Sequence, residues 1–295
     1  MAWKEREVSE AEVASLVRAG ESPLMARLLA LRGVSADTLE AFFNPSHKNL
    51  LPPSLLPGIA EAVSLILAAK KENKKTVIIG DYDCDGICAT AILVKTLEIL
   101  EFDVSPFLPK RMEEGYGLNA KTVERLLKEH PDVKLIVTVD NGINSVDEAA
   151  FLKSKGIDIV VTDHHLPGEE LPDCPVVNPK VRSPDELSGL CGAGVAFMLA
   201  NALIVRFREE GLYDGASVAG PLIVLAGLAT ITDIMPLKDQ NRILVTEALK
   251  LFQKYAPIGL KELFHRVCRP GVVVMTSRDF GYAIGPRINA SGRMS

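Results

Sequence analysis

The fold of this chain is decided by residues 76–86, which read Thr76-Val77-Ile78-Ile79-Gly80-Asp81-Tyr82-Asp83-Cys84-Asp85-Gly86. The first four residues are β-branched and match a short buried strand, and three alternating aspartates follow them. The next residues, 86–100, have a helical pattern. A strand that runs into a loop and then a helix is the start of a βαβ unit, so this stretch predicts a parallel sheet.

The same alternation extends along the chain. Helices are expected at 59–71, 86–100, 121–129 and 146–155, and strands at 76–80, 104–108, 135–139, 157–162 and 175–178. This order predicts an α/β fold, a parallel sheet with helices on both faces. An N-terminal helical segment, with helices opening at Ser9 and spanning 35–43, precedes it, and a mostly helical portion follows Gly192. Residues 271–275 are ambiguous.

The composition excludes several classes of protein. With 295 residues, 47% hydrophobic and 24% charged, the chain matches an ordinary globular protein rather than a disordered one. It has no apolar run of about 18 residues and no signal-peptide pattern at its start, so we expect no membrane segment. Five cysteines without a CxxC pair argue against a disulfide framework or thiolate zinc site and favour the cytoplasm. The net charge of −5 argues weakly against a nucleic-acid partner.

Three of the expected strands end in carboxylates. Asp81 begins the first acidic group, Asp140-Asn141-Gly142 follows the strand at 135–139, and Asp163-His164-His165 follows the strand at 157–162. Ligands of open parallel sheets bind at the carboxyl ends of the strands, so these groups should converge. Carboxylates with one or two imidazoles suit Mn²⁺ or Mg²⁺. Two such ions can activate water and stabilise a displacement at phosphorus, which predicts hydrolysis of a phosphate ester or anhydride.

Each group taken alone has another interpretation. Residues 81–86 resemble the start of a calcium loop, but the twelfth position, where that loop needs Glu, is Ile92. Residues 140–142 are typical of a turn, and residues 163–165 of a helix cap with surface histidines. Asp233 lies in an apolar stretch, where it either caps a helix end or binds a cation, because a buried unpaired carboxylate is costly. The combination favours one metal site.

The set formed by residues 81–86, 138–142, 163–165 and the later Asp233 resembles the DHH phosphoesterase superfamily. Longer stretches resemble its RecJ-type branch of single-stranded-DNA exonucleases, at residues 51–58, 115–118, 177–180, 191–197 and 285–293. The resemblance implies metal-dependent hydrolysis of single-stranded DNA from its 5′ end to mononucleotides, in DNA repair and recombination.

The resemblance also implies roles for individual residues. The core metal ligands would be Asp83, Asp85, Asp140, His164 and Asp233. Asp85 and Asp140 would be candidates to bridge two ions, and Asp81 would be either an additional ligand or an acid that contacts the ligands. Asp163 would orient a histidine, and His165 would contact the scissile phosphate or protonate the leaving oxygen. Asp85, Asp163 and His165 are therefore expected to take part in catalysis, with two Mn²⁺ or Mg²⁺ ions.

Phosphate contacts require basic side chains, and bases stack on aromatic rings. The expected nucleic-acid contacts are Arg111, Tyr116, Gly192, Gly194, Arg287, Asn289 and Arg293. The two glycines could let a phosphate approach a helix N-terminus, or could serve helix packing. Tyr116 could equally pack a turn, and the arginines could be ordinary surface charge or form structural ion pairs.

The resemblance implies a longer enzyme, with a second domain and an oligonucleotide-binding fold after residue 295. The expected division is a helical and Pro-rich segment at 1–57, a catalytic domain at 58–275, and the end of that domain or a linker at 276–295. Because at least six aspartates would belong to one cation-filled site, the net charge says little about DNA.

Two other functions stay open. One is a phosphodiesterase for short oligonucleotides or cyclic dinucleotides that uses the same metal centre. The other is a non-catalytic DNA-binding or replication-complex subunit, although such a subunit would not need the intact acidic set. Single-stranded DNA is the expected partner, and a single-strand-binding protein or a helicase is a candidate protein partner. The oligomeric state and the ability to cut RNA stay open.

Overall fold

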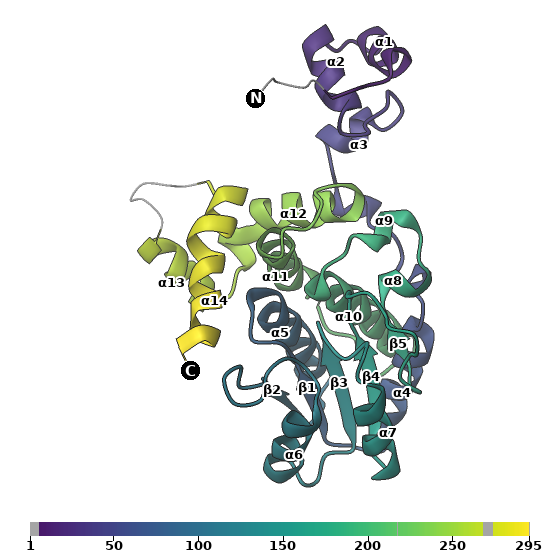
Figure 1. Cartoon of the computed structure of the whole chain (residues 1–295), viewed down its shortest axis with the longest axis vertical. Helices are drawn as coiled ribbons and strands as arrows, with labels where there is room; N and C mark the ends of the chain where they lie inside the picture. The colour runs from purple at the N-terminus through teal and green to yellow at the C-terminus, as the bar shows by residue number, and fades with distance from the viewer. Residues whose placement is uncertain (1–5, 217, 268–273, 295) are drawn as a thin grey trace. The chain divides into compact units, whose positions relative to one another are not determined.

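The structure is a computed structural model that describes residues 6–216, 218–267 and 274–294, the side chains of Arg293 and Met294 excepted. By its internal contacts the chain divides into two compact units, Met1–Asn49 and Leu50–Ser295. The division at 1–57, 58–275 and 276–295 stays a prediction. Each unit is described by itself (Figure 1).

The first unit contains three short helices and a 3₁₀ turn: α1 (Glu10–Arg18), α2 (Pro23–Ala30), α3 (Leu39–Phe43) and η1 (His47–Asn49). The helix expected to open at Ser9 is confirmed, because the Ser9 hydroxyl accepts the backbone N–H of Glu12. The helix expected at 35–43 begins only at Leu39. The Thr38 hydroxyl hydrogen-bonds back to the Ser35 backbone and makes the preceding residues a turn.

The second unit is built on a five-stranded sheet, which confirms the predicted α/β fold. Its strands are β1 (Thr76–Ile79), β2 (Val104–Phe107), β3 (Leu135–Val139), β4 (Asp158–Thr162) and β5 (Val176–Val177). Neighbouring strands are all parallel, in the order β2-β1-β3-β4-β5 (Figure 1). The chain leaves β1 toward one edge and later returns to its other side with β3. This reversal makes the β1–β3 boundary the point where an open sheet binds ligands.

Helices cover both faces of the sheet, as predicted. On one face, Ile78 and Val137 pack into a core with α4 (Ile59–Lys71), α5 (Cys84–Ile99) and α10 (Gly192–Glu209). On the other face, Val77 and Ile136 pack with α6 (Ala120–Glu129) and α7 (Val146–Ser154). Successive side chains of a strand point to opposite faces, so a strand that is apolar throughout supplies both cores.

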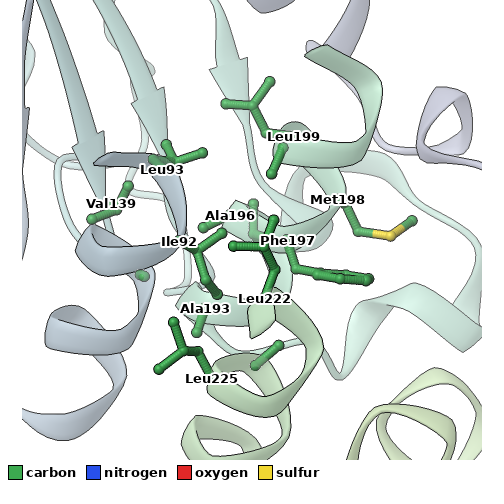
Figure 2. Packing of buried hydrophobic residues seen from close by; sticks show 14 of the residues in the cluster. Ile92, Leu93, Val139, Ala193, Ala196, Phe197, Met198, Leu199, Leu222 and Leu225 are labelled. Atoms are coloured by element: carbon green, nitrogen blue, oxygen red, sulfur yellow. The ribbon is translucent and has the colours of Figure 1, made fainter. Parts of the chain in front are cut away.

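The portion after β5 is mostly helical, which confirms that prediction. Besides α10 it contains α8 (Pro179–Arg182), α9 (Asp185–Ser188), α11 (Ala219–Thr232), α12 (Asp239–Tyr255), α13 (Ile258–Val267), the π-helix η3 (Asp279–Ile284) and α14 (Gly285–Met294). A short turn, η2 (Pro53–Leu55), precedes α4. Figure 2 shows Ile92 of α5, Phe197 of α10 and Leu222 of α11 in one apolar cluster that also includes Val139 of β3. Residues 271–273, within the ambiguous segment, lie outside the described part.

Among the described residues no single helix is long and apolar enough to cross a membrane. One pair, His47–Leu55 with Ile59–Lys71, meets the length and composition criteria together, but is bent by 80°.

Close packing of α11 on α12 yields a stability prediction. A Cβ at Gly227 would lie 2.3 Å from the Ala248 Cβ and 2.7 Å from the Leu244 carbonyl oxygen, too close for either. Gly227→Ala should therefore lower the free energy of unfolding by about 1–3 kcal/mol, the usual range for an overpacked core. Gly259→Ala on α13 is the matched control, because a Cβ there meets nothing within 4 Å. Denaturant unfolding should show the loss for Gly227→Ala alone, and equal stability of both variants would contradict the packing argument.

Candidate functional site

Three neighbouring strands deliver buried aspartates to one edge of the sheet. Asp81, Asp140 and Asp163 follow β1, β3 and β4, and they are 3%, 3% and 1% exposed. The structure thus places the acids together, as the sequence pattern predicts. They lie at the reversal between β1 and β3.

The loop after β1 is shaped by its helix. Asp83 is the N-cap of α5, and its carboxylate accepts the backbone N–H of Gly86 at 3.0 Å. Gly86 has no room for a side chain, since a Cβ would lie 2.6 Å from the backbone of Asp81. The loop is therefore tight, and carboxylate oxygens of Asp81 and Asp83 lie within 4.8 Å of each other.

Asp85 links this loop to the second half of the unit. Its Oδ2 accepts the backbone N–H of Gly192 at 2.7 Å, and its Oδ1 accepts that of Ala193 at 2.8 Å. Both amides belong to the first turn of α10, where a negative charge is favoured by the helix dipole. The N-terminus of α10 is thus capped by a carboxylate from α5.

The two glycines of this region have different surroundings. A Cβ on Gly192 would lie 2.6 Å from the Asp140 Cβ, so the glycine lets α10 approach that aspartate. Gly194 lies further into the buried helix, and its nearest neighbour is the Leu190 side chain at 3.1 Å. The contacts of both glycines are internal, and their role in phosphate binding stays a prediction.

The backbone of Asp140 is held in a left-handed conformation, with φ of 61°. Such a conformation is unfavourable for a residue with a side chain and requires support from its surroundings. The Asn141 amide donates to the carbonyls of Val139 at 2.8 Å and Ile79 at 3.2 Å, which ties the turn to both strands. The Tyr116 hydroxyl donates to the Asp140 carbonyl at 2.8 Å.

His164 lies at the centre of the acids. Its Nε2 is 3.1 Å from the Asp140 Oδ1 and 3.7 Å from both the Asp85 Oδ2 and the Asp233 Oδ2. Asp233 comes from the C-cap of α11 and is the most distant of the set in sequence. The structure therefore brings Asp233 to the same site as the three acidic groups that follow the strands.

His165 and Asp163 form a hydrogen-bonded pair beside this centre. The His165 Nδ1 lies 2.7 Å from the Asp163 Oδ1, which also accepts the backbone N–H of His164. The Asp163 Oδ2 accepts the N–H of Ile143 at 3.0 Å. Burial opposes ionisation of Asp163, but the His165 hydrogen bond and charge outweigh it, so its pKa lies below the usual value. The same hydrogen bond raises the pKa of His165.

The other buried carboxylates have protein partners that only partly offset the cost of burial. Burial first, and then the neighbouring Asp83, raises the pKa of Asp81 to about 7; burial and then Asp85 raise that of Asp233 to about 7. Burial also raises the pKa values of Asp85 and Asp140, and lowers that of His164. Among the described residues, the Asp81 Oδ1 and Asp140 Oδ1 are buried and accept no hydrogen bond of acceptable geometry, although the His164 Nε2 lies 3.1 Å from the latter. Burying a carboxylate oxygen without a partner is costly, and a bound cation would remove that cost.

The donor set fits divalent metal ions. Three groups have ligand atoms that all lie within 4.8 Å of one another: Asp81, Asp83 and Asp140; Asp85, His164 and Asp233; and Asp140, His164 and His165. Asp140 and His164 each belong to two groups, so the groups form one continuous site. Carboxylate oxygens with one or two imidazoles suit Mn²⁺ or Mg²⁺.

The residues expected to contact nucleic acid lie in two places. The Arg111 guanidinium lies over the Tyr82 ring, 4.8 Å from its centre, and the Tyr116 hydroxyl is 3.4 Å from the His165 Nδ1. The Arg287 side chain is exposed and donates to the carbonyl of Ala283 at 2.7 Å. The side chain of Arg293 lies outside the described part.

Asn289 has a contact that the sequence did not indicate. Its side-chain oxygen accepts the backbone N–H of Cys84 at 2.6 Å, in the loop between Asp83 and Asp85. Asn178 was also missed: its amide donates to the His165 carbonyl at 2.9 Å, while its oxygen accepts the N–H of Lys180. The Asn-Pro pair that opens α8 is a recognisable helix-start signal, but its histidine partner is not readable from sequence.

A family model described as "DHH family, N-terminal domain" matches residues 75–224, just over half of the chain. The chain belongs to the DHH family. This confirms the resemblance found in the motifs. The matched range contains all the strands and all the site aspartates except Asp233.

Similar proteins carry the RecJ name. The "Single-stranded-DNA-specific exonuclease RecJ" of Haemophilus influenzae is 40% identical over 92% of this chain and 47% of that protein. A "Crystal structure of exonuclease RecJ bound to manganese" superposes with a TM-score of 0.72 and 38% identity. The superposition covers 83% of this chain and 60% of the other. A Mn²⁺ complex of RecJ from Thermus thermophilus superposes with a TM-score of 0.77 and 33% identity. The superposition covers 96% of this chain and 39% of the other. The chain spans about half the length of the curated relative.

The crowding around Asp140 predicts a difference between two neighbouring glycines. Gly192→Ala should displace Asp140 and reduce Mn²⁺ affinity about tenfold or more, as loss of a group that orients a ligand does. Gly194→Ala should change it much less, because the flexible Leu190 side chain can move. Mn²⁺ binding is measured by calorimetry, with thermal unfolding of both metal-free variants as the folding control. Equal affinities would show that α10 does not position Asp140.

The raised pKa values of Asp81 and Asp233 predict an unusual pH dependence of the metal-free protein. An acid whose pKa is higher in the folded than in the unfolded state destabilises the fold as pH rises between those two values, here from about 4 to about 7. Lowering the pH from about 7.5 to about 5.5 should therefore add about 1 kcal/mol of stability for each carboxyl, after allowance for partial screening by solvent. Asp81→Asn and Asp233→Asn should each reduce this gain in thermal unfolding, as should saturating Mn²⁺. A pH-independent wild type would contradict the assignment.

Proposed function

We propose that the chain is the metal-binding catalytic portion of a 5′-to-3′ exonuclease that hydrolyses single-stranded DNA to mononucleotides. The observation that carries this proposal is the buried cluster of aspartates and His164 at the sheet reversal, where two carboxylate oxygens have no hydrogen-bond partner within the described part of the chain. Membership of the DHH family and the names of the similar RecJ proteins support the substrate class. Roles in DNA repair and recombination, a cytoplasmic location, and a single-strand-binding protein or helicase partner are part of the same proposal.

The geometry supports two ion positions. Asp81, Asp83 and Asp140 would hold one Mn²⁺ or Mg²⁺, and Asp85, His164 and Asp233 would hold the other. Asp140 lies closest to both sets, through its 3.1 Å approach to His164, and is the better bridging candidate. Asp85 is less suited to bridging, because both of its oxygens already accept backbone amides. Bound ions would polarise the phosphoryl oxygen and lower the pKa of a nucleophilic water.

His165 and Asp163, beside the metal centre, would transfer the proton that the leaving oxygen needs. Asp163 receives the Nδ1 hydrogen of His165, which fixes the ring and leaves its Nε2 for the substrate. The raised pKa of His165 favours a protonated ring, so Nε2 can donate to the scissile phosphate or to the leaving 3′ oxygen. In this proposal Arg111, Tyr116, Arg287, Asn289 and Arg293 contact the DNA backbone or bases, with Gly192 and Gly194 near a phosphate.

Cleavage of DNA of several lengths tests the proposal. Single-stranded DNA labelled at its 3′ end is incubated with the chain and Mn²⁺ or Mg²⁺, beside a dinucleotide, a cyclic dinucleotide and pyrophosphate. Stepwise mononucleotide release from the 5′ end of long strands is expected. Hydrolysis of the dinucleotides alone would instead establish the short-oligonucleotide phosphodiesterase, and metal binding without any hydrolysis would favour the non-catalytic subunit.

Two substitutions assign the chemistry within that assay. Asp140→Asn should abolish both Mn²⁺ binding at the shared position and cleavage. His165→Ala should keep Mn²⁺ bound but lower kcat by about 10²–10⁴-fold, the usual contribution of a general acid. Glu169→Gln is the matched control, because Glu169 is an exposed acid just beyond the motif. Full activity of Asp140→Asn would remove this carboxylate from the mechanism.

A further inference from the structure

The segment between β2 and α6 carries two groups to the metal centre. Within residues 108–119, Arg111 lies over the ring of Tyr82, and Tyr116 donates its hydroxyl hydrogen to the Asp140 carbonyl. The Tyr116 and His165 rings meet edge to face, with centres 5.9 Å apart. This segment has no regular helix or strand in the structure, so something else must fix its position.

An ion pair away from the metal centre holds the first part of this segment in place. The Glu114 side chain is only 7% exposed and receives the Nε of Arg125, from α6, on its Oε1. The Glu114 Oε2 accepts the Arg125 Nη2 at 3.1 Å and the backbone N–H of Lys110 at 2.8 Å. One carboxylate therefore joins both ends of the turn that contains Arg111 to a helix outside the site.

The guanidinium is fully engaged in holding the segment. Its Nη2 also donates to the Leu108 carbonyl at 2.7 Å, its Nη1 lies 3.2 Å from both oxygens of Glu129, and its plane covers the Phe107 ring at 3.9 Å. All three nitrogens of the guanidinium have protein acceptors, so its position is fixed by the protein itself. A guanidinium makes this fork in one plane, which a lysine cannot copy.

Asn119 supports the other end of the segment. Its amide donates to the carbonyls of Glu114 at 3.0 Å and Tyr116 at 3.1 Å, while its oxygen caps α6 at Lys121 and Thr122. The helix that carries Arg125 and the turn that carries Tyr116 are thus joined at two places.

We propose that the Glu114–Arg125 ion pair is a positioning pair that sets Arg111 and Tyr116 at the metal centre and so governs how the terminal nucleotide of the DNA is held. The inference rests on the proposed exonuclease function. Neither residue of the pair touches a metal-binding carboxylate. Loss of the pair should weaken substrate positioning without changing metal binding.

Steady-state kinetics with a matched set of variants tests the pair. Arg125→Lys keeps the positive charge but cannot form the two parallel hydrogen bonds to the Glu114 carboxylate. Glu114→Gln keeps the size of the side chain but removes its negative charge. Each should raise KM for a 5′-phosphorylated oligonucleotide about tenfold, within the usual range for coupled neighbours, with Mn²⁺ affinity unchanged. Glu129→Gln is the control, because its ion pair with Arg125 is surface-exposed and should contribute little.

A second background separates positioning from general stability. In a chain that carries Arg111→Ala and Tyr116→Ala, the pair has nothing left to position, so Arg125→Lys should change kcat/KM less than about twofold. The same tenfold loss in both backgrounds, or a loss that follows the thermal midpoint of unfolding, would overturn the proposal.

Hydrogen exchange provides a readout independent of activity. Amides of residues 110–118 should exchange faster in Arg125→Lys than in wild type, while those of β1 and β3 should not change. If the wild-type chain does not cleave DNA, the proposed function fails, and faster exchange with retained Mn²⁺ affinity would still support the pair as the device that orders the segment. Unchanged exchange of residues 110–118 would overturn it in either case.

Discussion

The contact between Asp85 and the first turn of α10 is the interaction on which the rest of the site depends. Both carboxylate oxygens accept backbone amides, at 2.7 and 2.8 Å, in a place sealed from water. Hydrogen bonds to a charged acceptor are stronger than those between neutral groups, and losing one here would leave a buried charge. The contact joins the loop after β1 to a helix more than a hundred residues later. Gly192 in turn brings that helix against Asp140.

The same crowding explains why the site is electrostatically unfavourable without a cation. Asp81, Asp85, Asp140 and Asp233 are buried together, and the protein supplies partners for only some of their oxygens. A protein selected for stability alone would not place them so. Unfavourable polar arrangements that the surrounding structure maintains are typical of functional sites. Here the two packed faces of the sheet provide that support.

The sequence predicted much of this arrangement. Each acidic group follows an apolar strand, and a parallel sheet brings strand ends to one edge, so convergence of Asp81, Asp140 and Asp163 follows from local pattern alone. Asp233 could be singled out because it is a lone acid in an apolar stretch, where it ends the helix α11. The sequence did not predict the short helix α2, and it placed the start of α3 four residues too early. Both helices are short, and the latter boundary depends on a local hydroxyl hydrogen bond. The contact of Asn289 with Cys84 was not predicted, because nothing local relates residues so far apart.

By itself the sequence determined the α/β class, the strands and the acidic strand ends, because periodicity and residue type are local properties. Only the tertiary structure decided which groups share an environment. It placed His164 within 3.7 Å of three carboxylates, directed both oxygens of Asp85 to amides of α10, and paired Glu114 of the segment 108–119 with Arg125 of α6. Those outcomes depend on desolvation and on distances between segments far apart along the chain, which residue order does not specify.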